Sequence, residues 1–188
     1  MKHFSFLTHS LLATALLFLG FSVQSKQSQQ TSHMKFFESI KSLCGTRFEG
    51  YSSFPEDPGD AFRDQLLVAS ISSCGDTQIR IPFQVGADTS RTWVLSLVDD
   101  GIELKHDHRH ADGTPDEVSM YGGTTAQAGS ELSQSFPADD YTAELIPDAA
   151  TNEWFLTLSE DGKKLTYYLE RHAKPRFKAK LNRISKQE

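Results

Sequence analysis

The chain has 188 residues, a length that accommodates one well-buried domain or at most two very small ones. Its 19 lysines and arginines and its 25 aspartates and glutamates give a formal net charge of -6. This balance argues against a nucleic-acid-binding protein, which needs a basic surface to displace the counterions of the phosphate backbone.

Residues 1–25 have the pattern of a secretory signal peptide. An apolar stretch runs from Leu11 to Phe21, and Val23 and Ser25 follow at the spacing that signal peptidases accept, so we expect cleavage after Ser25. The alternative, an uncleaved membrane anchor, would need roughly 20 apolar residues, about twice the length of this stretch. The sequence therefore predicts a secreted or periplasmic protein with no transmembrane anchor after processing, in which residues 26–32 form a disordered lead.

The chain contains two cysteines, Cys44 and Cys74. In an oxidising compartment a single disulfide between them is expected, and a free or catalytic thiol is the alternative. If Gly45 to Tyr51 and Leu66 to Ser73 form neighbouring antiparallel strands, the two cysteines fall opposite each other. The bond would close a loop of about 30 residues. Because it lowers the conformational entropy of the unfolded chain, it would stabilise the fold by roughly 3–4 kcal/mol.

Helical periodicity occurs once, from His33 to Leu43, where four apolar residues share one face and Ser32 can cap the helix. Further along the chain the pattern changes to strict alternation, which predicts strands with one buried face, as in residues 78–85. Pro82 cannot donate a hydrogen bond to a neighbouring strand, so we expect an edge or a bulge at that position.

Two hairpins are predicted, each around an Asp-Gly pair that favours a tight turn. If Asp100 and Gly101 form the first loop, the pairs that share one face are Leu97 with Leu104, Leu95 with His106, Trp93 with His108, and Arg91 with His110. In the second hairpin the corresponding pairs are Leu158 with Leu165, Leu156 with Tyr167, and Trp154 with Leu169. Apolar residues match in both registers, and a slip by one residue would send each apolar set to the wrong face.

Shorter candidate strands bring the total to about ten; they are Glu117 to Tyr121, Ser130 to Phe136, Thr142 to Ile146, and Arg176 to Asn182. Turn residues separate them at short intervals, which is typical of a barrel or a sandwich. The sequence predicts a mainly β protein: one antiparallel up-and-down β-barrel over residues 33–183, preceded by one short helix and followed by a polar tail, 184–188. The alternative is a two-sheet β-sandwich, whose core is filled, whereas a barrel of this size can enclose a small ligand.

Three of the seven histidines fall within five residues, in His106-Asp107-His108-Arg109-His110. Alternation puts the three imidazoles on one face of a strand and Asp107 with Arg109 on the other. Successive residues on one face lie roughly 6.7 Å apart, whereas metal–nitrogen bonds are about 2.0–2.1 Å long, so only two neighbouring imidazoles can share an ion. His106 and His108 are therefore the candidate ligands for a transition metal. A third ligand would come from Asp112, Asp116, Glu117, Tyr121 or His172.

The same face also predicts a ligand-binding interior that needs no metal, in which an aromatic wall and polar groups hold an anionic or hydrogen-bonding small molecule. Haem held through a histidine is a narrower version of this hypothesis. The structural alternative is a filled core without an interior ligand, in which His106 and His108 are hydrogen-bonded and His110 is solvated. The candidate lining residues are Arg91, Trp93, His106, His108 and His110, with Arg47 or Tyr167 beside them.

We expect a binding protein rather than an enzyme, with a metal-dependent enzyme that uses His106 and His108 as the alternative. The sequence has no Gly-x-Ser-x-Gly elbow, and Asp107 projects away from its histidine neighbours. Two further segments each have two interpretations. The acidic residues of 112–117 could attract calcium or cap a turn, and the basic residues of 174–186 could bind an anionic lipid or polymer or form a closing strand with a solvated face.

One series of short motifs resembles a group of uncharacterised secreted bacterial proteins. The motifs are Ser90-Arg91-Thr92-Trp93, Leu104-Lys105-His106-Asp107-His108-Arg109-His110, Asp112-Gly113-Thr114-Pro115-Asp116, and Tyr121-Gly122-Gly123. The resemblance covers the chain from about Cys44 to Asn182 and implies no particular activity. The expected barrel is also similar to the calycin fold, which implies small-ligand binding by analogy alone.

Overall fold

The structure is a computed structural model that describes residues 31–54, 60–99 and 101–184. These residues form a mainly β fold whose sheet is an almost closed antiparallel barrel, so the predicted barrel is confirmed and the sandwich alternative was wrong. The predicted signal peptide, residues 26–30 of the predicted lead and residues 185–188 of the predicted tail lie outside the described residues. Within the described part of the chain, no helix has the length and apolar character needed to cross a membrane.

The barrel is an up-and-down meander. Its strands are β1 (Arg47–Phe54), β2 (Leu67–Ser70), β3 (Ser73–Cys74), β4 (Gln78–Val85), β5 (Asp88–Val98), β6 (Gly101–His108), β7 (Tyr121–Thr124), β8 (Ser133–Pro137), β9 (Asn152–Leu158), β10 (Lys164–Arg171) and β11 (Lys174–Ile184). The order around the sheet is β7-β6-β5-β4-β2-β1-β11-β10-β9-β8, with β3 paired to β4 beside this path. An isolated bridge between Gly123 and Ala138 joins the two ends of the sheet and nearly completes the barrel.

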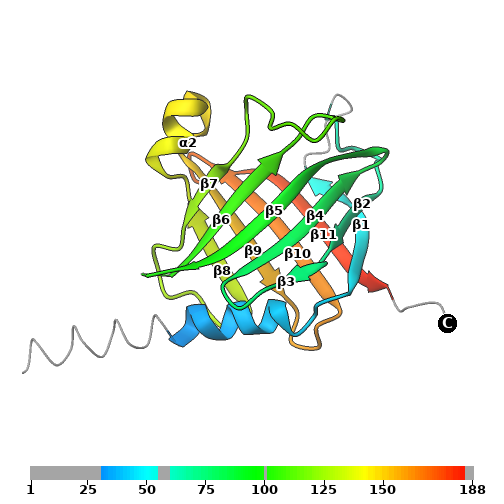
Figure 1. Cartoon of the computed structure of the whole chain (residues 1–188), viewed down its shortest axis with the longest axis vertical. Helices are drawn as coiled ribbons and strands as arrows, with labels where there is room; N and C mark the ends of the chain where they lie inside the picture. The colour runs from blue at the N-terminus through cyan, green and yellow to red at the C-terminus, as the bar shows by residue number, and fades with distance from the viewer. Residues whose placement is uncertain (1–30, 55–59, 100, 185–188) are drawn as a thin grey trace, which may run out of the picture.

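A helix over residues 31–41 closes one end of the barrel, at the bottom of Figure 1. Phe36, Phe37 and Ile40 on its inner face are fully buried and belong to the same core as the strands. The predicted helix is therefore present. It already includes residues 31 and 32, so Ser32 lies within the helix and not at the predicted cap position.

The predicted disulfide is confirmed: Cys44 and Cys74 are bonded, and they are 30 residues apart in the sequence. β1 and β2 pair as antiparallel neighbours, with Arg47 opposite Ser70, which brings the two cysteines together. The bond ties the segment that follows the helix to β3, at the same end of the barrel that the helix closes.

The two hairpins differ in how well the sequence predicts their register. The β9–β10 hairpin has the predicted pairs, which are Leu158 with Leu165, Leu156 with Tyr167, and Trp154 with Leu169. The predicted register of the β5–β6 hairpin was wrong by two residues, because the pairs are Arg91 with His108, Trp93 with His106, Leu95 with Leu104, and Leu97 with Ile102. Gly101 belongs to β6 and not to the turn, because it pairs with Val98. A Cβ at Gly101 would lie 2.1 Å from the hydroxyl oxygen of Thr125. A shift of two keeps every side chain on its predicted face.

The predicted strand from Thr142 to Ile146 was wrong. This segment forms the helix α2 (Asp140–Leu145), followed by the short helix η1 (Pro147–Ala149). The side chain of Asp139 accepts a hydrogen bond from the backbone amide of Thr142, which is the interaction of a helix N-cap. Asp139 also forms an ion pair with Lys105 of β6, so α2 is held against the barrel wall.

The end of the barrel opposite the 31–41 helix has irregular strand pairing. Among the described strands, register shifts occur between Ser52 and Phe54 in β1, between Phe83 and Val85 in β4, and between Leu169 and Glu170 in β10. β4 is not an edge strand, but Pro82 lies between the stretch of β4 that pairs with β2 and the stretch that pairs with β3, where the pairing on that side is interrupted. Bulges are common at barrel rims and beside functional sites, because they redirect side chains.

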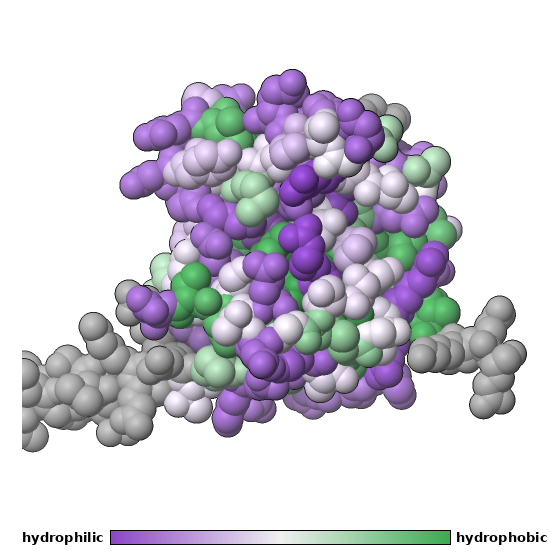
Figure 2. All heavy atoms as spheres, in the orientation of Figure 1, coloured by the Kyte–Doolittle hydropathy of each residue, from purple (hydrophilic) through white to green (hydrophobic). Residues whose placement is uncertain are grey.

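The outer face of the barrel differs in character from the interior. In Figure 2 hydrophilic residues cover most of the visible surface, and hydrophobic residues are scattered among them. Within β9, Trp154, Leu156 and Leu158 are buried whereas the residues between them are partly exposed. The hydrophobic core therefore lies inside the barrel.

Candidate ligand-binding cavity

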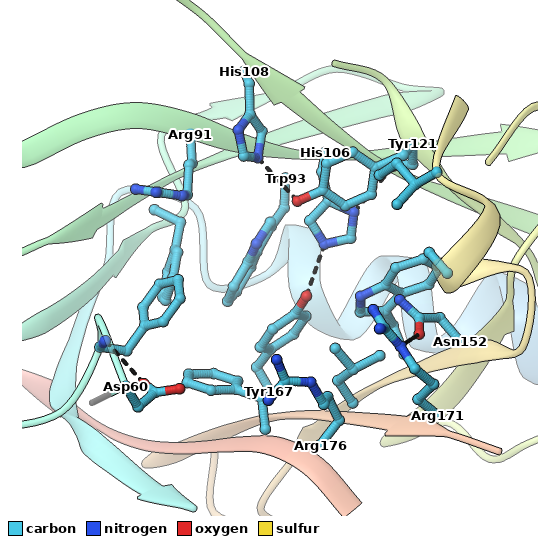
Figure 3. Close-up of a pocket in the computed structure, with 17 residues that line it drawn as sticks. Asp60, Arg91, Trp93, His106, His108, Tyr121, Asn152, Tyr167, Arg171 and Arg176 are labelled. Atoms are coloured by element: carbon cyan, nitrogen blue, oxygen red, sulfur yellow. Dashed lines mark hydrogen bonds between the residues drawn. The ribbon is translucent and has the colours of Figure 1, made fainter. Parts of the chain in front are cut away.

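The irregular end of the barrel contains a partly open cavity of about 350 Å³ (Figure 3). Its walls combine aromatic rings, imidazoles and guanidinium groups from several strands with residues of η1 and of the loop before β2. The lining residues are Asp60, Phe62, Phe83, Arg91, Trp93, His106, His108, Tyr121, Ile146, Ala149, Asn152, Trp154, Tyr167, Leu169, Arg171, Arg176 and Phe177. The interior beside Trp93 and His108 is therefore hollow.

Most candidates from the sequence lie at this cavity. Arg91 and Trp93 of β5 and His106 and His108 of β6 all line it, because they are paired neighbours on the inner face of the barrel. Tyr167 also lines it, whereas Arg47 lies elsewhere and pairs with Glu49.

The structure places His110 outside the cavity. β6 ends at His108, and His110 is an exposed residue of the following loop, with Asp116 and Glu117 within 4 Å of its ring nitrogens. That the remaining candidates, Arg91, Trp93 and His106 among them, bind a ligand stays a prediction.

Asp107 projects from the opposite face of β6, as alternation predicts, and it contacts Arg109, which follows the strand. The Asp107 side chain is only 2% exposed, and it accepts hydrogen bonds from Arg80 at 2.6 Å and from Arg109 at 2.9 Å. Burial raises the pKa of Asp107, but the two guanidinium groups outweigh that effect and hold it below the ordinary value. Asp107 is therefore part of the outer wall and is not available to the histidines inside.

Aromatic rings build the inner wall of the cavity. Trp93 is 2% exposed and stacks against Phe83 and against Tyr167, with ring centroids 4.4 Å apart in both pairs. The imidazole of His106 stacks on Tyr121 at 4.7 Å and contacts Trp154. Rings packed in this way form a rigid surface, since each is held by its neighbours.

The protein itself occupies both nitrogens of His106. Nδ1 lies 3.1 Å from the backbone carbonyl oxygen of Tyr121, and Nε2 lies 2.8 Å from the hydroxyl of Tyr167. Burial lowers the pKa of His106 to about 3, so the ring is neutral at physiological pH. A carbonyl only accepts hydrogen bonds, so Nδ1 carries the proton and the Tyr167 hydroxyl donates to Nε2.

A second imidazole–phenol pair lies beside the first. The Tyr121 hydroxyl is 3.1 Å from Nε2 of His108. Burial and the charge of Arg91 lower the pKa of His108, and burial raises the pKa of Tyr121 to about 12. Both pairs are therefore neutral at pH 7, and the imidazoles contribute no positive charge to the cavity.

The cavity nevertheless has a cationic lining, which the arginines supply. Within the described residues, three guanidinium groups line it, those of Arg91, Arg171 and Arg176, whereas the one carboxylate in the lining is that of Asp60. The whole chain has the opposite sign, with a formal net charge of -6. This local excess of positive charge distinguishes the cavity from the rest of the molecule.

The predicted metal pair has limited room for an ion. A metal held by His106 and His108 would have to displace the Tyr167 hydroxyl or the Tyr121 carbonyl from His106. The acidic loop after β6 instead groups His110 with Asp116 and Glu117, whose ligand atoms all lie within 4.8 Å of one another at the surface. In the same loop, Asp112 accepts hydrogen bonds from the amide and hydroxyl of Thr114, as expected for a residue that caps a turn.

Sequence reasoning missed the arginines on the far side of the cavity, Arg171 and Arg176. Alternation along β11 buries Phe177, Ala179 and Leu181 and therefore assigns Arg176 to the outer face. The shift in the β10–β11 register pairs Leu169 with Phe177 but Glu170 with Pro175, so Arg176 is an extra, bulged residue. A signal for Arg171 was available, because it lies two residues beyond the inward-facing Leu169.

Comparison with known proteins finds no matching family, no matching curated protein and no matching solved structure. The resemblance to uncharacterised secreted bacterial proteins and the similarity to calycins therefore stay predictions.

Proposed function

We propose that this chain is an exported binding protein that holds one small organic molecule inside its barrel. The observation that carries the proposal is the cavity of about 350 Å³, which is lined by Arg91, Trp93, His106 and His108. Ligand pockets in proteins have volumes of about 300–1,000 Å³ and combine mostly apolar walls with a few polar groups. The aromatic wall and the three arginines match this description.

The state of the buried polar groups supports binding rather than catalysis. His106, Tyr167, His108 and Tyr121 are hydrogen-bonded to one another in two pairs. Their pKa values are shifted away from neutrality by burial, whereas a general acid or base works best with a pKa near the operating pH. These pairs therefore shape and rigidify the wall and orient hydrogen-bonding groups towards an occupant.

Two observations support export. The disulfide between Cys44 and Cys74 is of the kind that persists in oxidising compartments. Residues 1–25 have the composition of a secretory signal peptide. We infer that the protein meets its ligand outside the cytoplasm.

The first prediction tests occupancy of the cavity with an uncharged fluorescent probe, phenylnaphthylamine. The purified protein should bind one probe per chain with increased fluorescence, because the aromatic walls exclude water from the probe. Leu169→Trp should weaken binding at least about tenfold, since Leu169 lines the cavity and the larger indole would fill part of it. The measurement is a fluorescence titration.

Val98→Trp is the matched control, because Val98 is 40% exposed and lies in the hairpin at the closed end of the barrel. It should bind the probe as the unmodified protein does. The proposal is wrong if the unmodified protein binds no probe, or if Leu169→Trp binds it as tightly as the control does.

A further inference from the structure

We propose, on the basis of the binding function above, that the occupant is an amphipathic organic acid whose anionic group is held by Arg171 and Arg176. Its apolar body would lie against the aromatic walls deeper in the barrel. Figure 3 shows that Arg171 and Arg176 approach the cavity from one side, whereas Arg91 and His108 lie on the other. The assignment of the anion to the first side rests on strand geometry, on charge and on the neighbouring apolar residues.

Strand geometry turns Arg176 towards the cavity. In a regular strand, Arg176 and Phe177 would face opposite sides of the sheet. The bulge opposite Leu169 and Glu170 changes this local alternation, and both Arg176 and Phe177 line the cavity. Arg176 is also exposed to solvent, so its guanidinium group is accessible to an anionic group that enters the cavity.

The charges of these two arginines are not neutralised by the described part of the protein. Nε of Arg171 donates to the neutral side-chain oxygen of Asn152 at 2.9 Å, which orients the guanidinium group and leaves its charge uncompensated. Among the described residues, no carboxylate forms an ion pair with Arg171 or Arg176. A guanidinium fork held by a neutral residue is suited to bidentate recognition of a carboxylate, sulfonate or phosphate group.

On the other cationic side of the cavity, the charge of the arginine is already compensated. Arg91 donates to the carboxylate of Asp88, and its guanidinium carbon lies 5.5 Å from the centre of the Phe62 ring. His108 is neutral at physiological pH, because burial and the charge of Arg91 lower its pKa. Arg91 therefore already has a counter-ion, whereas Arg171 and Arg176 remain to be neutralised.

The neighbouring residues indicate what is attached to the anionic group. Arg171 follows Leu169 on the inner face of β10, and Arg176 precedes Phe177 in β11, so each arginine adjoins an apolar lining residue. Trp154 pairs with Leu169 and extends this wall into the barrel. An inorganic anion would leave these apolar surfaces without a partner, whereas an acid with an aromatic or aliphatic body would cover them.

The experiment compares two probes that share one aromatic body. Anilinonaphthalene sulfonate carries a sulfonate, and phenylnaphthylamine is its uncharged counterpart. We expect the sulfonate to bind at least about tenfold more tightly, because each charge-assisted hydrogen bond adds affinity. Arg171→Gln combined with Arg176→Gln should weaken the sulfonate about 10- to 100-fold and change the affinity of the uncharged probe less than about threefold.

Arg183→Gln is the matched control, since Arg183 is an exposed arginine near the opposite end of β11. It should leave both affinities unchanged. Arg176→Gln alone, at an exposed position, should retain the fold and still lose sulfonate affinity, while Arg176→Lys should restore part of it. Circular dichroism checks that each variant is folded.

The outcomes separate this inference from the binding function. Binding of neither probe would overturn both. Equal binding of the two probes, with no effect of the arginine substitutions, would refute the organic-acid assignment and leave the binding function intact. A loss of sulfonate affinity in Arg91→Gln, with none in the Arg171 and Arg176 variants, would show that the anion lies on the opposite side of the cavity.

Discussion

At the scale of single residues, His106 couples the stability of the barrel to pH. It is buried beside Tyr167 and Trp154, and burial lowers its pKa to about 3. In the unfolded chain its pKa returns to about 6.5. Between these two pH values the unfolded state therefore binds a proton that the folded state does not bind, and stability decreases as the pH falls.

We predict that His106 contributes a loss of up to about 1.4 kcal/mol in the free energy of unfolding for each pH unit below about 6.5. Urea unfolding at about pH 7 and about pH 5 measures this slope. His106→Asn should have a shallower slope. Leu158→Ala, a change at a buried, non-titrating residue of the β9–β10 hairpin, should lower stability at both pH values without altering the slope. Equal slopes in the unmodified protein and in His106→Asn would contradict the prediction.

Part of the cavity lining could be predicted from the sequence, because strand parity survives a register error of two residues. The register of the β5–β6 hairpin differs from the expected one by two residues, yet Trp93 and His106 stay on the inner face, since only an odd shift reverses a strand. That His110 lies beyond the end of β6 could not be predicted, because alternation does not reveal where a strand ends. Arg176 was missed because a bulge changes the alternation on which the prediction depends.

At the scale of elements, Asp139 connects α2 to the barrel. Its side chain caps the helix and forms an ion pair with Lys105 of β6. Burial raises the pKa of Asp139, but Lys105 and the hydrogen bonds from Thr142 outweigh that effect and lower it. The segment that follows contributes Ile146 and Ala149 to the cavity wall.

We predict that Asp139→Ala destabilises α2 by about 1–3 kcal/mol, because it removes both the cap and the partner of Lys105. Hydrogen exchange of the α2 amides should become faster, and the affinity of the uncharged probe should fall. Asp140→Ala is the control, since Asp140 lies in the same turn, is exposed and does not cap the helix. Equal exchange rates in the two variants would show that Asp139 does not hold this element.

The elements themselves differed in how readily they could be predicted. The β9–β10 hairpin was predictable because its apolar pairs and its turn chemistry agree. The segment from Thr142 to Ile146 was misassigned because its short alternation of polar and apolar residues suits a strand as well as a single helical turn. The acceptor at Asp139 decides between the two, since it satisfies the free amide of Thr142.

At the scale of the whole molecule, the disulfide and the cavity lie at opposite ends of the barrel. We predict that Cys44→Ser combined with Cys74→Ser lowers the free energy of unfolding by roughly 3–4 kcal/mol, since the bond closes a loop of about 30 residues. Probe affinity of the folded protein should stay unchanged. Urea unfolding and fluorescence titration measure the two quantities, and a variant with unaltered stability or with lost probe binding would refute this division.

The barrel could be predicted from the number of short strands and the regular spacing of turn residues. The closure between Gly123 and Ala138 could not, because it depends on an isolated bridge between residues that no local pattern connects. The volume of the cavity could not be predicted from the sequence either. Whether an interior is filled depends on how side chains from many strands meet, and sequence periodicity gives only the face on which each one lies.

The helix over residues 31–41 plugs the barrel at the end farthest from the arginines. In the described part of the molecule, a ligand would therefore enter and leave through the same opening. If the barrel binds a ligand as proposed, one ligand must leave before the next can bind. A protein that delivers the ligand or removes it would have to contact the rim of the barrel at Arg176.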